Sequence, residues 1–209
     1  MKRTLLSKLF IGLMLISIAC DKEAKNGPEA TTTTSEAVSV ASEEPAIEAK
    51  VTLVKYSDYQ CPACKYFVPI EHQLKEDFGD DINIVVKNFP LSMHAYAHVA
   101  ARSSEAARKQ GKYQEMHDMI FEGQEQWSQG NADGIFIGYA TTIGLEVDQF
   151  RQDMNSAEMN RIVMSDGREG RDLGVSSTPT FFINGDIIES NPSTYPAFKA
   201  LVEQYMDLF

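Results

Sequence analysis

Two cysteines separated by two residues, Cys61 and Cys64, are the side chains in this sequence best suited to do chemistry. Sulfurs at this spacing can form and break a disulfide reversibly. A strand pattern at residues 51–56 ends just before the pair, and a helix pattern begins with it, marked by Tyr66, Phe67, Val68, Ile70 and Leu74. We therefore expect Cys61 at a helix N-terminus, where unpaired N–H groups and the helix dipole favour its thiolate.

The first residues have the pattern of an export signal. Three basic residues among the first eight precede an apolar run at 9–19, which is too short to span a bilayer as a helix. Ser17-Ile18-Ala19-Cys20 resembles a bacterial lipoprotein cleavage site, in which Cys20 is lipidated and becomes the first residue. The alternative is an ordinary secretory signal. Residues 1–19 therefore predict a periplasmic or other extracytoplasmic protein, held at the membrane through a lipid on Cys20.

Cysteine count and charge limit the partners further. The chain has three cysteines, so lipidation of Cys20 leaves only the pair at 61 and 64 and no separate structural disulfide within one chain. Removal of the leader leaves 16 Lys and Arg residues against 30 Asp and Glu residues, a net charge of −14. This charge argues against nucleic acid and anionic lipid headgroups as partners.

The rest of the chain divides into a tether and one domain. Residues 20–49 contain no aromatic residue and are rich in Thr, Ser, Glu and Ala, which predicts a disordered tether that reaches about 30 Å from its anchor. Residues 50–209 suffice for one domain with its own core. The expected elements are strands at 51–57, 82–88, 179–184 and 187–189, helices at 62–77 and 194–207, and a helical stretch at 92–172.

The helical stretch at 92–172 is an insertion between a βαβ half and a ββα half. We expect it to cover the cysteine pair as a cap. Its apolar residues are expected to form its own core, with a substrate groove as the alternative; they include Met116, Met119, Ile120, Phe121, Trp127, Ile135 and Phe136. Asn184-Gly185 predicts a tight hairpin between the last two strands.

These features together resemble the DsbA-like branch of the thioredoxin superfamily. The matching residues are Tyr56-Ser57-Asp58-Tyr59-Gln60-Cys61-Pro62-Ala63-Cys64, Phe89-Pro90-Leu91 with His94, Gly111-Lys112-Tyr113, and the segment from Gly174 to Gly185 that contains Thr178-Pro179. The resemblance covers essentially all of residues 50–209. It implies an α/β thioredoxin fold with an inserted helical cap domain.

The resemblance also implies roles for individual residues. Cys61 would be the exposed nucleophile that forms the mixed disulfide, and Cys64 the buried thiol that resolves it. Pro179 would be a cis-proline facing the pair, and Thr178 would offer backbone hydrogen bonds to an extended substrate. Pro62 suits the first position of the helix, because the N–H that proline lacks has no partner there.

Two positions differ from the pattern of this family. Six residues before Cys61, where the family usually has a buried acid, this chain has Lys55. We hypothesise that Lys55 lowers the pKa of the cysteine thiols and makes the disulfide more oxidising; the alternative is that its side chain extends to the surface. Pro62-Ala63 stands where DsbA has Pro-His, which predicts a reduction potential between about −120 mV for DsbA and about −270 mV for thioredoxin.

The resulting expectation is a monomeric enzyme that exchanges disulfides with cysteine-containing extracytoplasmic proteins, preferably as a dithiol oxidase. A membrane redox partner would recycle the cysteine pair, and no cofactor is expected. Three alternatives stay open: a reductase of the same fold, a tethered module that binds peptides without redox chemistry, and a zinc site formed by the cysteines with His94 and His98. The zinc site is disfavoured because the sequence has no second Cys-X-X-Cys.

Overall fold

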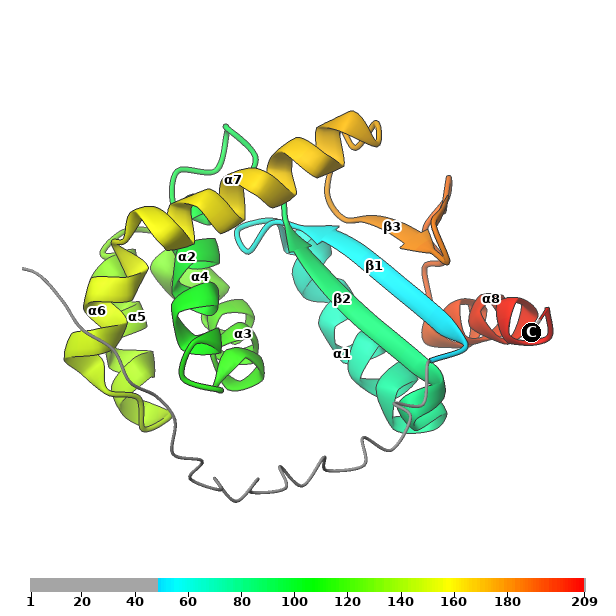
Figure 1. The fold of residues 1–209 in the computed structure, drawn as a ribbon, viewed down its shortest axis with the longest axis horizontal. Coiled ribbons are helices and arrows are strands. Elements are labelled where there is room, and N and C mark those ends of the chain that lie inside the picture. Colours follow the sequence, from blue (N-terminus) through cyan, green and yellow to red (C-terminus); the bar gives the residue numbers. More distant parts are fainter. Residues whose placement is uncertain (1–48, 209) are drawn as a thin grey trace, which may run out of the picture. The chain divides into compact units, whose positions relative to one another are not determined.

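The computed structural model of the protein describes residues 49–208 (Figure 1). The predicted leader, the Cys20 lipidation site and nearly all of the predicted tether lie outside these residues. None of the helices within residues 49–208 combines the length and the apolar character needed to cross a membrane.

A mixed four-stranded sheet with the order β2-β1-β3-β4 forms the centre of the domain (Figure 1). Strand β1 (Val51–Ser57) pairs in parallel with β2 (Ile82–Asn88) and antiparallel with β3 (Thr180–Ile183), which in turn pairs with β4 (Asp186–Ile187). The β-branched and aromatic residues of β1 suit this central, buried position. The first two strands have the predicted bounds, and the last two are shorter than predicted.

The predicted hairpin turn between β3 and β4 is confirmed. Asn184 and Gly185 both have positive φ values, 48° and 91°. A two-residue turn that follows the twist of the strands requires this backbone, and Asn-Gly adopts it readily.

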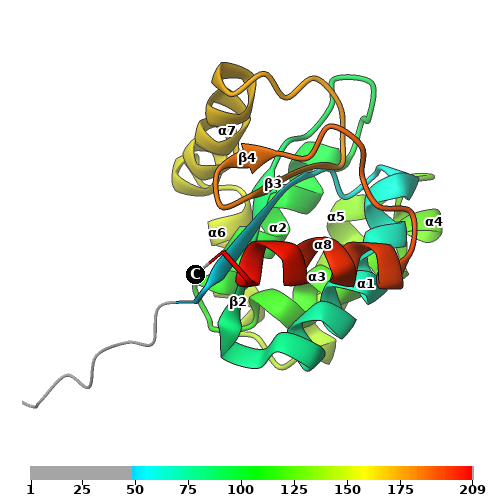
Figure 2. The same cartoon turned by 90° about the vertical axis from the view of Figure 1, so that its right-hand side faces the viewer.

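Helices cover both faces of the sheet. Helix α1 (Pro62–Phe78) and helix α8 (Tyr195–Met206) lie side by side on one face (Figure 2). The rings of Phe67, Phe181 and Phe198 pack edge to face there. Helix α7 (Ala157–Asp172) crosses the other face (Figures 1 and 2). It approaches the sheet closely at Gly170, where a Cβ atom would lie 2.8 Å from ring atoms of Tyr56 and Phe89.

The helical insertion packs beside the sheet (Figure 1). Before α7 it contains α2 (Ala97–Arg108), α3 (Tyr113–Glu122), α4 (Gln124–Trp127), α5 (Ala132–Thr142) and α6 (Val147–Met154). The sequence predicts neither the four-residue helix α4 as a separate element nor the 3-10 turn at Gly79–Asp81. Both are too short to show a periodic apolar pattern.

The insertion has its own apolar core, and this core also contains both cysteines. Met116, Ile120, Phe121, Trp127 and Phe136 form one buried cluster together with Tyr59, Cys61 and Cys64. Ile135 packs against this cluster, whereas Met119 lies outside it. The prediction of a core is therefore confirmed, and the redox pair lies at its border with the sheet domain.

Candidate active site

Cys61 occupies the N-cap position of α1, as the sequence predicts. Its backbone is extended, with φ −81° and ψ 120°, and Pro62 follows at the first helical position. The Cys61 carbonyl accepts hydrogen bonds from the N–H groups of Cys64 (3.1 Å) and Lys65 (3.2 Å). The sulfur therefore lies where the first N–H groups of a helix face outward.

The surroundings of the Cys61 sulfur favour its thiolate. A hydrogen bond from the Cys64 thiol is the largest of the effects that lower the pKa of Cys61 to about 5. A hydrogen bond with Thr178 and the backbone N–H groups of Cys64 and Ala63 act in the same direction, whereas burial opposes them. Cys61 is thus a thiolate at neutral pH when the pair is reduced.

The loop that contains Thr178 and Pro179 faces this sulfur. The peptide bond between the two residues is cis, as the resemblance implies for Pro179. The Thr178 carbonyl lies 3.4 Å from Cys61 Sγ and accepts a hydrogen bond from it when Cys61 is protonated. Two segments far apart in the sequence, the start of α1 and the residues before β3, therefore meet at the reactive sulfur.

Cys61 is less exposed than the resemblance implies. The residue retains 8% of its accessible surface, while Cys64 retains 0%. The reason is the apolar cluster around the cysteines, in which Tyr59 and the insertion cover the pair from one side. The expected difference between the two cysteines is present, but it separates a nearly buried sulfur from a fully buried one.

Cys64 has the opposite electrostatic surroundings. Burial raises the pKa of Cys64 far above its usual range, and the hydrogen bond with Cys61 adds to this rise. The N–H of Asp58 donates to Cys64 Sγ at 3.5 Å. Cys64 is therefore a protonated thiol whenever the pair is reduced.

Lys55 is fully buried, so the alternative that its side chain extends to the surface is wrong. It lies in the central strand, opposite Val86 on one side and Phe181 on the other. Its ammonium pairs with Glu71 of α1 at 2.6 Å and lies 3.4 Å from the Cys64 carbonyl oxygen. Its charge opposes the rise in the pKa of Cys64 and is not among the main causes of the lowered pKa of Cys61.

Sequence reasoning missed Glu71, the partner of Lys55. Burial raises the pKa of Glu71, and the Lys55 charge opposes this rise. A signal was present: Glu71 lies four residues after Phe67 and three before Leu74, so it interrupts the apolar side of α1. A carboxylate at such a position needs a buried cation.

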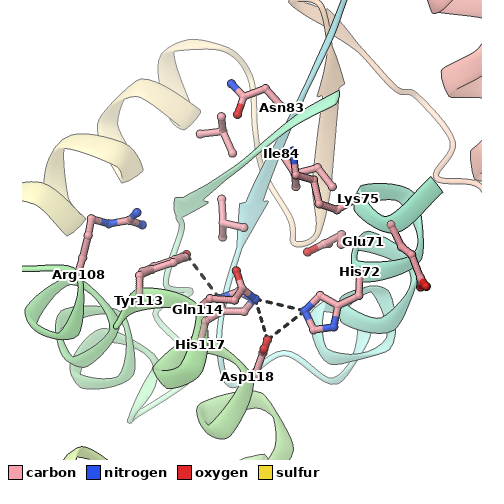
Figure 3. Close-up of a pocket in the computed structure, with 13 residues that line it drawn as sticks. Glu71, His72, Lys75, Asn83, Ile84, Arg108, Tyr113, Gln114, His117 and Asp118 are labelled. Carbon is pink, nitrogen blue, oxygen red and sulfur yellow. Dashed lines mark hydrogen bonds and ion pairs between the residues drawn. The ribbon is translucent and has the colours of Figure 1, made fainter. Parts of the chain in front are cut away.

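Glu71 also lines a cleft beside α1 (Figure 3). The cleft has a volume of about 750 Å³ and lies between α1, β2 and the facing residues of α3. His72 and Asp118 pair across it at 3.2 Å, and the buried His117 bonds to the Tyr59 hydroxyl at 2.8 Å. The cleft thus reaches the buried residues behind the redox pair.

The loop before Cys61 is held by Asp58. Its buried carboxylate accepts hydrogen bonds from the N–H groups of Gln60 and Leu91, each at 2.7 Å, and pairs with His94 Nδ1 at 2.8 Å. His94 is therefore bonded to Asp58, not directed to the cysteines as the zinc alternative required. Residues 49–208 contain no group of three or more His, Cys, Asp or Glu side chains placed to hold a metal ion.

A second residue that sequence reasoning missed is Gln124 of α4. Its buried side-chain amide donates to the carbonyl oxygens of Tyr59 (2.7 Å) and Cys61 (3.1 Å). A bond from a side chain to distant backbone leaves no spacing pattern in a sequence, so nothing in the sequence indicated this contact.

Comparisons with known proteins agree with this architecture. The thioredoxin family model matches residues 46–204. BdbD from Bacillus subtilis superimposes with a TM-score of 0.68 at 23% identity, covering 77% of this chain and 90% of that one. Alpha-DsbA1 from Wolbachia pipientis gives 0.66 at 20% identity, with 77% and 88% covered. At these identities the likeness shows a shared fold.

Curated relatives match over a shorter region. A protein named Na(+)/H(+) antiporter NhaA 1 from Salinispora arenicola is 38% identical over 140 residues, which is 66% of this chain and 21% of the relative. A protein of the same name from Mycobacterium sp. strain KMS is 36% identical over 143 residues, 66% of this chain and 22% of the relative. The chain spans about a fifth of the length of these relatives, so their name describes much longer proteins.

Proposed function

This chain belongs to the thioredoxin family and has the DsbA-like form of its fold, and we propose that it is an exported thiol:disulfide oxidoreductase acting through Cys61 and Cys64. The observation that carries the proposal is the unlike state of two neighbouring sulfurs. The pKa of Cys61 is lowered to about 5, whereas that of the fully buried Cys64 is raised. In such a pair, Cys61 is the sulfur that the substrate attacks and that later leaves as a thiolate. Cys64 is the sulfur that closes the disulfide with it.

The reaction in the oxidising direction follows from this geometry. A substrate thiolate attacks Cys61 Sγ of the disulfide, the bond between Cys61 and Cys64 breaks, and Cys64 leaves and takes up a proton. A second substrate thiolate then attacks the substrate sulfur of the mixed disulfide, and Cys61 leaves as a thiolate. Two electrons pass from the substrate dithiol to the cysteine pair, and the substrate gains a disulfide.

We propose the dithiol oxidase direction because the reduced form is stabilised. A Cys61 pKa of about 5 lies between those of DsbA, about 3.5, and thioredoxin, about 7. A low thiolate pKa makes Cys61 a good leaving group and makes the disulfide oxidising. The expected potential therefore lies between about −120 and −270 mV.

The setting of the reaction is part of the proposal. The pattern at residues 1–19 supports export, and Cys20 is the proposed lipid attachment site. One solved structure with a TM-score of 0.63 and 19% identity is described as a periplasmic thioredoxin-like protein from Salmonella enterica serovar Typhimurium. We propose that the protein acts outside the cytoplasm on proteins with cysteines and that a membrane redox partner reoxidises it.

Equilibration of the full chain in glutathione buffers tests the direction of electron flow. We expect a potential between those of DsbA and thioredoxin, together with rapid oxidation of a reduced, unfolded test protein that Cys61→Ala abolishes. A potential near that of thioredoxin would favour a reductase. A wild-type chain that exchanges no disulfide with glutathione would favour a non-redox binding module.

Export and anchoring need a separate measurement. We expect the chain expressed in a Gram-negative host to fractionate with membranes and to be released by Cys20→Ser without loss of disulfide exchange. Recovery of both forms in the soluble periplasmic fraction would contradict the lipid anchor.

A further inference from the structure

Gln124 is held in place by the core of the helical insertion. Trp127, on the same short helix, donates from Nε1 to the Ile120 carbonyl at 2.6 Å and packs against the Phe136 ring, with the two centroids 5.4 Å apart. Gly123, directly before α4, fits closely against α5, because a Cβ atom there would collide with the Tyr139 hydroxyl. The core of the insertion therefore fixes the position of Gln124 independently of its contacts with the residues around Cys61.

The Gln124 side chain joins this core to the backbone at Cys61. Its amide nitrogen donates to the carbonyls of Tyr59 and Cys61 at 2.7 and 3.1 Å, and the residue is 6% exposed. These two carbonyls lie on either side of Gln60. A buried carbonyl that loses its donor carries a desolvation cost, so both bonds constrain the loop.

Other contacts between the insertion and this region hold neighbouring residues. Lys65 Nζ donates to the Glu122 carbonyl at 3.2 Å, at an exposed site one turn into α1. The N–H of Tyr96 donates to the Gln60 side chain at 2.8 Å. Of the insertion residues that make these contacts, Glu122, Tyr96 and Gln124, only Gln124 bonds to the peptide unit of Cys61 itself.

We propose that Gln124 is a positioning residue for the proposed thiol–disulfide exchange: it fixes the Cys61 peptide against the helical insertion and sets how readily the Cys61 sulfur is released as a thiolate. This inference rests on the proposed function. The physical reason is that stabilisation of the thiolate depends on the orientation of the Cys61 peptide. The N–H groups at the start of α1 stabilise the thiolate only while the Cys61 backbone keeps its orientation, and the amide of Gln124 presents the positive end of its dipole to that peptide.

The test compares substitutions at Gln124 with the same substitutions at Gln126, an exposed residue of the same helix. Gln124→Glu keeps the shape of the side chain but replaces the donor with an anion, and Gln124→Met removes the donor without adding charge. Gln126→Glu and Gln126→Met are the matched controls. The readouts for the full chain are the Cys61 thiol pKa, from the pH profile of alkylation, and the equilibrium constant with glutathione.

We expect Gln124→Glu to raise the Cys61 pKa by about one unit and to shift the glutathione equilibrium about tenfold toward the disulfide. Gln124→Met should shift the equilibrium about threefold, since one or two hydrogen bonds are lost without an added charge. The Gln126 variants should match the wild type in both measurements.

The inference is overturned if the Gln124 variants lower only the unfolding midpoint and leave the thiol pKa and the equilibrium at wild-type values. If Gln124→Glu does not fold, Gln124→Met alone decides. Failure of the wild-type chain to exchange disulfides with glutathione would instead overturn the proposed function, so the two failures are distinguishable.

Discussion

Cys61 and Cys64 lie within one turn of the same helix, yet their surroundings shift the pKa values of the two thiols in opposite directions. Cys61 caps the helix and receives hydrogen bonds that favour its thiolate. Cys64 points into the interior and is kept protonated by burial. The residue type is the same at both positions, so the difference arises from helix position and from the elements packed against each sulfur.

The comparison extends to what lies behind each cysteine. Cys61 faces the Thr178–Pro179 loop, which supplies a neutral backbone carbonyl. Behind Cys64 is a buried ion pair, Lys55 with Glu71, which borders a cleft. The structure therefore places the charged pair on the side of the resolving thiol, whereas the sequence suggested only that a cation lies close to the cysteines.

Substitution of Cys64 should have the largest effect, because it alters both sulfurs. We expect Cys64→Ala to leave the mixed disulfide of Cys61 with glutathione unresolved, because only the Cys64 sulfur can close the pair, and to raise the pKa of Cys61 toward the ordinary value of about 8.5. The reason is that the hydrogen bond from Cys64 is the largest of the effects that lower the pKa of Cys61. Alkylation as a function of pH measures the change.

Cys64→Ser is the matched control for this experiment. A serine hydroxyl can still donate to the Cys61 sulfur but cannot form the disulfide. We expect it to trap mixed disulfides as Cys64→Ala does while keeping the Cys61 pKa closer to 5. Equal pKa values in the two variants would contradict the assignment of the low pKa to this hydrogen bond.

Removal of the Lys55 ammonium comes next in size. Lys55→Met leaves Glu71 buried without its partner, which should lower the free energy of unfolding by about 3–5 kcal/mol. The double variant Lys55→Met with Glu71→Leu should recover most of this loss, because it removes the unpaired charge. Lys65→Met, at a half-buried lysine whose ammonium makes only an exposed hydrogen bond to the Glu122 carbonyl, is the control and should change stability by less than about 1 kcal/mol. Urea denaturation measures all three.

The same variants show which sulfur Lys55 affects. We expect the Lys55→Met single and double variants to resolve the mixed disulfide of Cys61 with glutathione more slowly, because Cys64 is the attacking thiol in that step and the ammonium opposes the rise in its pKa. The Cys61 pKa should change little. A clear rise in the Cys61 pKa would support the broader hypothesis from the sequence, that Lys55 makes both thiols more acidic.

The pH dependence of the reduced protein provides the third prediction. The folded pKa of Cys61, about 5, is below that of a cysteine in an unfolded chain, about 8.5. The resulting stabilisation is fully present above pH 8.5 and is lost as the pH falls through 5. Between pH 5.5 and 7.5 the reduced protein should gain about 2.5 kcal/mol relative to Cys61→Ser. Parallel curves for the two proteins would contradict the low pKa.

Several elements of this fold could be predicted because they are determined by residues close together in the sequence. The bounds of β1 and β2, the start of α1 at Pro62 and the turn at Asn184-Gly185 follow from β-branched runs, helix capping and the αL preference of Asn and Gly. The roles of Cys61 and Pro179 came from the family resemblance. In particular, the cis bond before Pro179 has no local signature.

The contacts that could not be predicted are those made between distant elements. Lys55 finds Glu71 only once α1 packs on β1, and Gln124 reaches Cys61 only once α4 is fixed by the insertion core. The Glu71 position showed that something unusual was buried on α1, but not which residue would pair with it. Predicting such partners requires the packing of elements that are far apart in the sequence.

Substitution of His94 should have the smallest effect. His94 pairs with Asp58, whose backbone bonds to both cysteines. The Asp58 carbonyl accepts from the Cys61 N–H at 3.0 Å, and the Asp58 N–H donates to Cys64 Sγ. His94→Ala removes one of the donors to the Asp58 carboxylate, so we expect a loss of about 1–2 kcal/mol in the free energy of unfolding. The pKa of Cys61 and the rate at which Cys64 resolves mixed disulfides should shift slightly and together.

His98→Ala, one turn further along and half-buried on α2, is the control for this variant. It should leave the Cys61 pKa and the resolution rate unchanged. A change confined to one sulfur in His94→Ala would show that Asp58 does not couple the two cysteines. The contrast between Cys61 and Cys64 would then depend on their separate neighbours, Thr178 and Lys55, alone.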